Sequence, residues 1–273
     1  FISFRLLRFP DLTVDGSFPL GGAVCAVLIA NGTDPFLATL IATAAGALAG
    51  MVTAALNVHL KIMDLLASIL MMIALYSINL RIMGRPNIPL IMEPTMFSML
   101  QPEWLADYVA RPLILLLVVI AAKIMLDMYF STRQGLAIRA TGSNPRMARA
   151  QGVNTGAMAI LGMAISNALV ALAGAMFAQT QGGADISMGI GTIVIGLAAV
   201  IVGESILPAR RIFYLTLAVI LGAIVYRFFI ALALNSDFIG LQAQDLNLIT
   251  AVLVVIALVI PLIKQRLTRR RHV

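Results

Sequence analysis

The chain has 273 residues, of which 61% are hydrophobic and only 11% are charged, and its mean hydropathy is +1.00. A soluble domain carries roughly 25% charged residues, so the composition excludes an ordinary soluble domain and predicts an all-α, polytopic membrane protein. The formal charge of +7 does not indicate a nucleic-acid partner, because the cations gather in connections on one side of the predicted spans. With one cysteine, Cys25, and two histidines, the sequence offers neither a disulfide nor a metal cluster.

Eight apolar segments follow a partial helix at residues 1–8, whose beginning we expect to precede this numbering. About 20 apolar residues cross the 30 Å core of a bilayer. The segments are 17–30, 35–56, 62–83, 112–129, 156–178, 187–207, 212–234 and 246–263. The first has about 14 residues, so it spans only if the polar stretch before it enters the membrane as part of a broken helix.

That polar stretch, DLTVDGS, carries two carboxylates, Asp11 and Asp15. They indicate either the mouth of a pathway across the membrane or a solvated cytoplasmic turn. The tetrapeptide that starts at Asp11, DLTV, is echoed by DISM at Asp185, and each precedes a segment rich in small residues. The echo predicts an inverted repeat with broken helices, in which a pseudo-twofold axis relates residues 9–130 to residues 155–260.

Three local features are predicted within the spans and their connections. Gly46 and Gly50 have the spacing that lets two helix backbones approach closely. Residues 57–61 are expected to form a tight turn. Lys123 and Asp127 lie four residues apart and so share a helix face, which favours a structural ion pair over catalysis.

The longest connection, residues 84–110, contains four prolines and the pair Trp104 and Tyr108. Proline stiffens such a segment without regular helix, and aromatic side chains suit a membrane interface. One interpretation is an ordered external cap that helps to receive a binding protein. The alternative is a passive segment at the interface.

A basic stretch, residues 131–155, follows the fourth of the eight apolar segments. Ser143 or Asn144 is expected to cap a helix of about two turns that starts at Pro145, and Gly152 suits the left-handed position after its end. Arg146 and Arg149 share a face of this helix. The alternative is an ordinary cytoplasmic loop made basic by the rule that fixes topology.

The run GLAIRATGSNPRMARAQGVN (135–154) resembles the cytoplasmic loop of ABC-transporter permeases of the branched-chain amino acid and ribose importer class. The positions that carry the likeness are Gly135, Ala137, Arg139, Ala140, Asn144, Ala148, Gly152, Val153 and Asn154. The opening FPDLTVDGSFPLG (9–21) looks most like the tryptophan and tyrosine uptake permeases of that class.

The resemblance implies a transmembrane pore made by two permease chains, a homodimer or a heterodimer. It also implies cytoplasmic ATPase subunits, which bind the ATP and Mg²⁺, and an external solute-binding protein. This chain itself would bind no cofactor and would be a single permease domain, residues 1–273, with a coupling segment at 131–154. The implied ATPase-coupling residues are Gly135, Arg139, Asn144, Pro145, Arg146, Met147, Arg149, Gly152 and Asn154.

The predicted function is to form the pathway of an ATP-driven importer of a small solute, an amino acid or a related molecule. Candidate pathway residues are Asp11, Asp15, Ser17, Ser68, Asn79, Ser166, Asn167 and Thr192. The sequence contains no phosphate-binding loop and no hydrolase motif, so an enzyme is not expected. An ion-coupled secondary carrier is the alternative, with Arg227 or the Lys123–Asp127 pair as its buried ionisable groups. A purely structural membrane subunit is a third.

The distribution of charge predicts the orientation. If residues 131–154 face the cytoplasm, alternation of the spans puts most lysines and arginines, including those of the C-terminal tail, on that side. The opposite connections carry most of the acidic residues. We therefore expect a multi-pass protein of the cell (inner) membrane with a cytoplasmic C-terminus.

Overall fold

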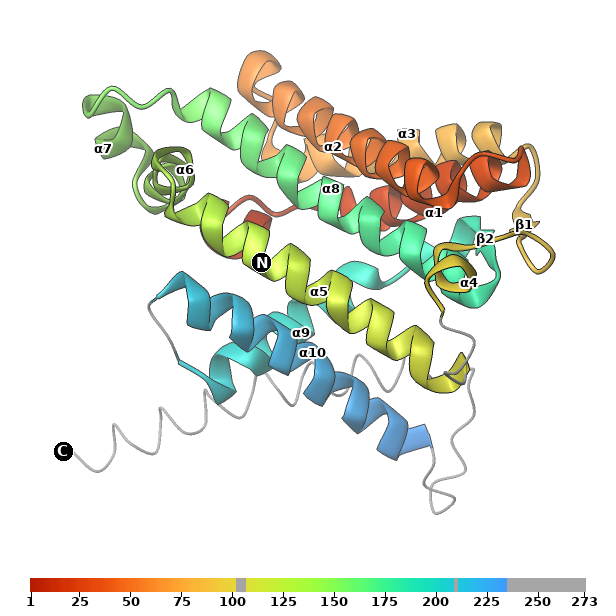
Figure 1. The fold of residues 1–273 in the computed structure, drawn as a ribbon. Helices are drawn as coiled ribbons and strands as arrows, with labels where there is room; N and C mark the ends of the chain where they lie inside the picture. Colours follow the sequence, from red (N-terminus) through yellow and green to blue (C-terminus); the bar gives the residue numbers. More distant parts are fainter. Residues whose placement is uncertain (102–106, 209–210, 235–273) are drawn as a thin grey trace. The chain divides into compact units, whose positions relative to one another are not determined.

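The computed structural model describes residues 1–101, 107–208 and 211–234, and helices make up most of it (Figure 1). The prediction of an all-α protein is confirmed. The chain divides into two compact units, residues 2–190 and residues 191–273 together with Phe1. The larger unit contains η1 (Ile2–Leu7), α1 (Val14–Ala30), α2 (Pro35–Leu60), α3 (Asp64–Met83), β1 (Asn87–Pro89), α4 (Met96–Leu100), α5 (Asp107–Ser131), α6 (Arg133–Ser143), α7 (Pro145–Ala150), α8 (Thr155–Gln181), β2 (Gly183–Asp185) and η2 (Ile186–Gly189). The smaller unit contains α9 (Thr192–Ile206) and α10 (Ile212–Leu234).

Six stretches of helix within the described residues are long and apolar enough to cross a bilayer. They are Pro35–Leu60, Asp64–Met83, Tyr108–Ser131, Thr155–Gln181, Ile186–Ile206 and Ile212–Leu232. The shorter apolar helix α1 begins three residues before the predicted segment 17–30, and its 17 residues extend about 26 Å. The polytopic prediction is thus confirmed, while the predicted eighth segment, 246–263, lies outside the described residues.

Helix α8 packs against α1 and α2 through backbone contacts that glycine makes possible. A Cβ atom on Gly50 would lie 2.3 Å from the carbonyl oxygen of Met163, and one on Gly46 would lie 2.3 Å from Ala171 Cβ. From the α1 side, a Cβ on Gly21 would lie 2.0 Å from the carbonyl oxygen of Ala171. Figure 1 shows α2 and α8 side by side. The predicted close approach at Gly46 and Gly50 is confirmed, and its partner is α8.

The ends of α2 follow from its flanking residues. Asp34 caps the helix, because its Oδ1 accepts hydrogen bonds from the amides of Phe36 (2.8 Å) and Leu37 (3.2 Å), and Pro35 occupies the first position. The prediction of a tight turn over residues 57–61 is wrong. The helix continues to Leu60, since no glycine or proline interrupts it, and it ends at Lys61, which has a left-handed φ of 54°.

The connection between α3 and α5 contains regular structure, so the expectation of a segment without helix is wrong. Strand β1 pairs antiparallel with β2, with Asn87 opposite Asp185. The short helix α4 is capped by Thr95 and Ser98: the Ser98 amide donates to Thr95 Oγ1 (3.3 Å), and the Thr95 amide donates to Ser98 Oγ (2.9 Å). Helix α5 begins at Asp107, five residues before the predicted start.

Two short turns carry the sequence echo. Asp11 Oδ1 accepts from the Thr13 amide (3.0 Å), and Asp185 Oδ1 accepts from the Ser187 amide (2.7 Å). Hydrogen bonds from the Ser187 hydroxyl and amide lower the pKa of the Asp185 carboxyl group below its usual value. Both aspartates therefore make the same i to i+2 turn. The pseudo-twofold relation between residues 9–130 and 155–260 stays a prediction.

In the smaller unit, α9 and α10 form a helical pair joined by glycine contacts. A Cβ atom on Gly203 would lie 2.0 Å from the carbonyl oxygen of Ala218, and one on Gly222 would lie 2.0 Å from that of Ala199. Each helix therefore places one glycine against the backbone of the other, which lets the two helices approach closely.

Candidate functional site

The segment predicted to couple to an ATPase contains two helices, α6 and α7, where the sequence indicated one. Thr132 caps α6, because its Oγ1 accepts from the Gly135 amide (3.3 Å), and the helix runs to Ser143. Two features of the sequence could have predicted α6. Thr132 is a good cap residue, and in the run that follows it the buried positions Gly135, Ile138 and Gly142 recur at helical spacing. Figure 1 shows α6 and α7 together at one end of the larger unit, with β1, β2 and α4 at the other.

Helix α7 coincides with the short helix predicted to start at Pro145. Asn144 is its cap, with Oδ1 accepting from the Met147 amide (3.1 Å), and Pro145 is its first residue. Gly152 has the expected left-handed φ, 83°. Two residues later, Asn154 caps α8, because its Oδ1 accepts from the Ala157 amide (3.1 Å). Only the two residues Gly152 and Val153 thus separate the cap residue of α8 from the C-cap of α7, Gln151.

The surface of α7 is polar and open, while its inner side is packed. Arg146 and Arg149 are exposed, and Met147 between them is 63% exposed. Ala148 is only 4% exposed and faces the protein. The helix therefore presents two guanidinium groups and a flexible thioether to whatever lies beyond this end of the unit.

The neighbouring helix α6 is held tightly. A Cβ atom on Gly142 would lie 1.7 Å from the carbonyl oxygen of Leu6 on η1, and one on Gly135 would lie 2.4 Å from that of Tyr129 on α5. Ile138 is fully buried. Because these contacts involve backbone, α6 cannot shift against η1 and α5 without breaking them.

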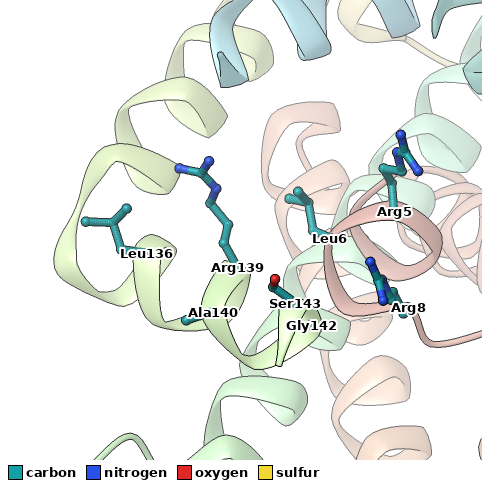
Figure 2. Close-up of a pocket in the computed structure, with 8 residues that line it drawn as sticks. All are labelled: Arg5, Leu6, Arg8, Leu136, Arg139, Ala140, Gly142 and Ser143. Atoms are coloured by element: carbon teal, nitrogen blue, oxygen red, sulfur yellow. The ribbon is translucent and has the colours of Figure 1, made fainter. Parts of the chain in front are cut away.

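Arg139, one of the predicted coupling residues, lies in a different setting from Arg146 and Arg149. It is half-buried and lines a cavity of about 430 Å³ between α6 and the N-terminal segment. Figure 2 shows Arg139 extending from α6 on one side, with Arg5 and Arg8 on the other. The sequence analysis did not bring these three cations together.

Four of the predicted pathway residues lie within or beside a buried hydrogen-bonded cluster at the start of α1. Asp11, 4% exposed, accepts through Oδ2 from Asn167 Nδ2 (2.9 Å), and Ser17 Oγ donates to Asn167 Oδ1 (2.7 Å). Ser166, next to Asn167 on α8, is 8% exposed. Thr13 Oγ1 lies 3.1 Å from Thr53 Oγ1, which extends the cluster to α2. The solvated-turn alternative is therefore wrong for Asp11.

Two more candidates extend this cluster towards α3. Ser68 is fully buried and donates to the carbonyl oxygens of Pro10 (3.3 Å) and Leu65 (2.9 Å). Asn79, 1% exposed, donates through Nδ2 to the carbonyl oxygen of Gly16 (3.1 Å). Its Oδ1 is buried, and no donor among the described residues reaches it. Such an acceptor is unusual in a protein interior.

The other two candidates make none of the hydrogen bonds just described. Asp15 lies in the first turn of α1 and is half-buried. Thr192 is the first residue of α9 and so belongs to the smaller unit. The structure thus brings six of the eight predicted residues into or beside the hydrogen-bonded cluster.

A second buried polar cluster was missed by the sequence analysis. Gln179, 4% exposed, donates from Nε2 to Thr39 Oγ1 (2.9 Å) and to Cys25 Sγ (3.3 Å), and its Oε1 accepts from the Met96 amide (2.9 Å). This side chain therefore ties the start of α4 to α1, α2 and α8. Its signal was available, because Gln179 follows Asn167 and Ala171 on the small-residue face of α8.

The Lys123–Asp127 pair on α5 is confirmed as an ion pair, with Nζ 2.5 Å from Oδ2. The two groups are four residues apart on one helix face, and both side chains are largely shielded from solvent. Pairing lowers the cost of carrying two charges in an apolar helix. Arg227, the other ionisable candidate, lies on α10 in the smaller unit.

Six stretches of helix among the described residues that are long and apolar enough to cross a bilayer define an all-α, polytopic membrane protein. Residues 1–260 match the family model of the permease component of branched-chain amino acid transport systems. The chain belongs to this family, and it is therefore the permease component of an ABC-type transport system for a small solute.

Curated relatives support the same assignment. The tyrosine transport system permease protein of Clostridioides difficile (strain R20291) is 38% identical over 93% of this chain and 83% of its own length. The uncharacterized protein RP368 of Rickettsia prowazekii (strain Madrid E) is 35% identical over 94% and 90%. The galactofuranose transporter permease protein YtfT of Escherichia coli (strain K12) is 28% identical over 79% and 61%. No solved structure matches the chain.

Proposed function

We propose that this chain lines the translocation pathway of an importer driven by ATP hydrolysis on separate subunits, and that α7 is the surface on which those subunits act. Two copies of the chain, or one copy and a close relative, enclose the pathway. An external binding protein delivers the solute. In this proposal the α7 end of the larger unit faces the cytoplasm, and so does the C-terminus.

The observation that carries the proposal is the junction between α7 and α8. The exposed residues of α7 lie directly before the capped start of a 27-residue helix that packs against both α1 and α2. A force applied to Arg146 or Arg149 therefore reaches the packed centre of the unit through two residues of connection. A displacement delivered there is passed on to whole helices, because close-packed backbones cannot absorb it by side-chain rearrangement.

The buried cluster around Asn167 is the proposed lining of the pathway. It joins the start of α1 to α2, α3 and α8, and it contains hydroxyl, amide and carboxylate groups suited to a small polar solute. Asn79 Oδ1, which receives no hydrogen bond from the part of the chain that the structure describes, is available to an ammonium or hydroxyl donor. We infer an amino acid as the solute class, with an aromatic one favoured by the likeness to the tyrosine permease protein.

The test is a charge reversal on α7. Replacing Arg146 and Arg149 by glutamate should leave the chain folded, because both side chains are exposed, but should abolish its copurification with the ATP-binding subunits from native membranes. The control is Arg85→Glu, an exposed arginine beside β1 at the opposite end of the larger unit (Figure 1). Undiminished recovery of the ATP-binding subunits with the doubly reversed chain would refute the coupling role.

One observation favours the alternative of an ion-coupled carrier. Asp11 is a buried carboxylate within the proposed pathway, and such groups commonly serve proton or ion coupling. Measuring solute uptake into proteoliposomes decides whether transport is driven by ATP hydrolysis or by an ion gradient. With ATP supplied at constant concentration, an importer keeps its rate when an ionophore collapses the proton and sodium gradients, whereas an ion-coupled carrier stops.

A further inference from the structure

The cavity between α6 and the N-terminal segment has an unusual lining. Arg5, Arg8 and Arg139 contribute three guanidinium groups, and the Ser143 hydroxyl adds a donor, while no carboxylate is among the lining residues. A guanidinium group carries five N–H donors and a positive charge, so the lining is cationic and rich in hydrogen-bond donors. The cavity is open to the surface, and its volume of about 430 Å³ falls within the range of ligand pockets.

Apolar side chains complete the lining and its rim. Leu6 and Leu136 line the cavity with the arginines, and Leu136 is 52% exposed. Phe4, on the same η1 segment, is 48% exposed. Figure 2 shows Leu6 between the N-terminal arginines and Arg139. An occupant that satisfies both kinds of group has an anionic head and an apolar remainder.

The position of the cavity agrees with that chemistry. Helix α6 begins two residues after the end of α5, whose Tyr108–Ser131 stretch is apolar enough to span a bilayer. The last turns of α5 expose Met125 (71%) and Met128 (67%), as a lipid-facing surface does. In Figure 1, α6 turns across the end of α5 instead of prolonging it. The cavity therefore lies where a span leaves the hydrocarbon core, which is the depth of lipid headgroups.

We propose that this cavity binds the phosphate-bearing headgroup of an anionic phospholipid, with Arg8 and Arg139 as its principal ligands. Guanidinium groups hold phosphate oxygens through paired hydrogen bonds, and the acyl chains lie over Leu136 and Phe4. Basic pockets at the ends of transmembrane helices are known to hold such headgroups. A lipid bound here contacts both η1 and α6, so it stabilises the position of α6, the helix that directly precedes α7.

The test measures lipid binding to the purified chain in detergent by native mass spectrometry, with phosphatidylglycerol and phosphatidylcholine as probes. Each cation near the membrane surface contributes about a fivefold gain in binding of anionic lipid, so the double variant R8N/R139Q should bind phosphatidylglycerol about 25-fold more weakly. Asparagine is chosen at position 8 because Arg8 has a φ of 55°, which asparagine tolerates. If the double variant does not fold, R8N alone should lose about fivefold.

Arg133→Gln is the matched control, because it removes an exposed cation from the same helix outside the cavity lining. It should bind phosphatidylglycerol as the wild type does. Equal loss in the control would show a diffuse surface charge and overturn the proposal, as would equal binding of phosphatidylcholine. Inorganic phosphate is the remaining arm: displacement of phosphatidylglycerol by millimolar phosphate would assign the cavity to a soluble anion instead.

Discussion

Asn167 gives the sharpest test of the buried polar cluster. Its side chain is fully buried, donates to Asp11 Oδ2 and to the carbonyl oxygen of Met163, and accepts from Ser17 Oγ. Asn167→Ala leaves Asp11 with one fewer donor and Ser17 without this acceptor. A hydrogen bond to a charged group contributes about 1.5–3 kcal/mol and a neutral one about 1 kcal/mol, so the free energy of unfolding should fall by roughly 2.5–4 kcal/mol.

A reciprocal exchange separates this hydrogen bond from mere loss of volume. Asn167→Asp alone places two carboxylates in contact, which is more destabilising than the alanine. Adding Asp11→Asn restores a carboxylate–amide pair, in which the side chain at position 11 now donates and the side chain at position 167 accepts. The side-chain oxygen of the new asparagine still accepts from the Thr13 amide. The exchanged protein should therefore regain most of the stability that Asn167→Asp loses, a coupling that a double-mutant cycle measures.

The assay is reversible denaturation in mixed micelles, followed by circular dichroism. Ser166→Ala, one residue away on α8, is the control and should change the free energy of unfolding by less than about 1 kcal/mol. The reasoning is refuted if Asn167→Ala costs no more than this control. It is also refuted if the exchanged pair is as unstable as Asn167→Asp.

Two further predictions concern the packing around α8. Gly50→Ala should lower the free energy of unfolding by more than about 2 kcal/mol, because the new Cβ would meet the carbonyl oxygen of Met163. The control is Gly196→Ala, whose Cβ would have nothing within 4 Å, and it should be neutral or stabilising by up to about 1 kcal/mol. Equal unfolding free energies for the two variants would contradict the close approach. Gln179→Leu removes the acceptor of the Met96 amide, so hydrogen exchange at the Met96 amide should accelerate while exchange along α2 stays slow. Unchanged exchange at Met96 would show that the Gln179 side chain does not hold α4 in place.

Sequence reasoning located features that depend on neighbours along the chain. A cap at Ser143 or Asn144, the first-turn Pro145 and the left-handed Gly152 are each specified within a few residues. The structure assigns the cap to Asn144 and places the other two as expected. The same holds for the Lys123–Asp127 pair, which needs only the helical spacing of four.

The features that were missed depend on residues far apart in the chain. The contact of Asp11 with Asn167 joins positions 156 residues apart, and that of Gln179 with Met96 joins positions 83 apart. No periodicity within one segment carries that information. The proximity of Arg8 to Arg139 depends on Gly142, whose missing side chain allows η1 to lie against α6. The tight turn predicted at 57–61 failed for a local reason, since polar side chains alone do not stop a helix that no glycine or proline interrupts.

Helix α8 runs without interruption from the residue after Asn154 to Gln179 and beyond, so both ends of the larger unit share one stiff element. At 1.5 Å per residue its 27 residues measure about 40 Å, close to the full thickness of a bilayer with its headgroups. Its Asn154 end adjoins α7, and its Gln179 end holds the start of α4. An axial or tilting movement imposed at one of these ends must appear at the other, so α7 and the start of α4 cannot move independently along this axis.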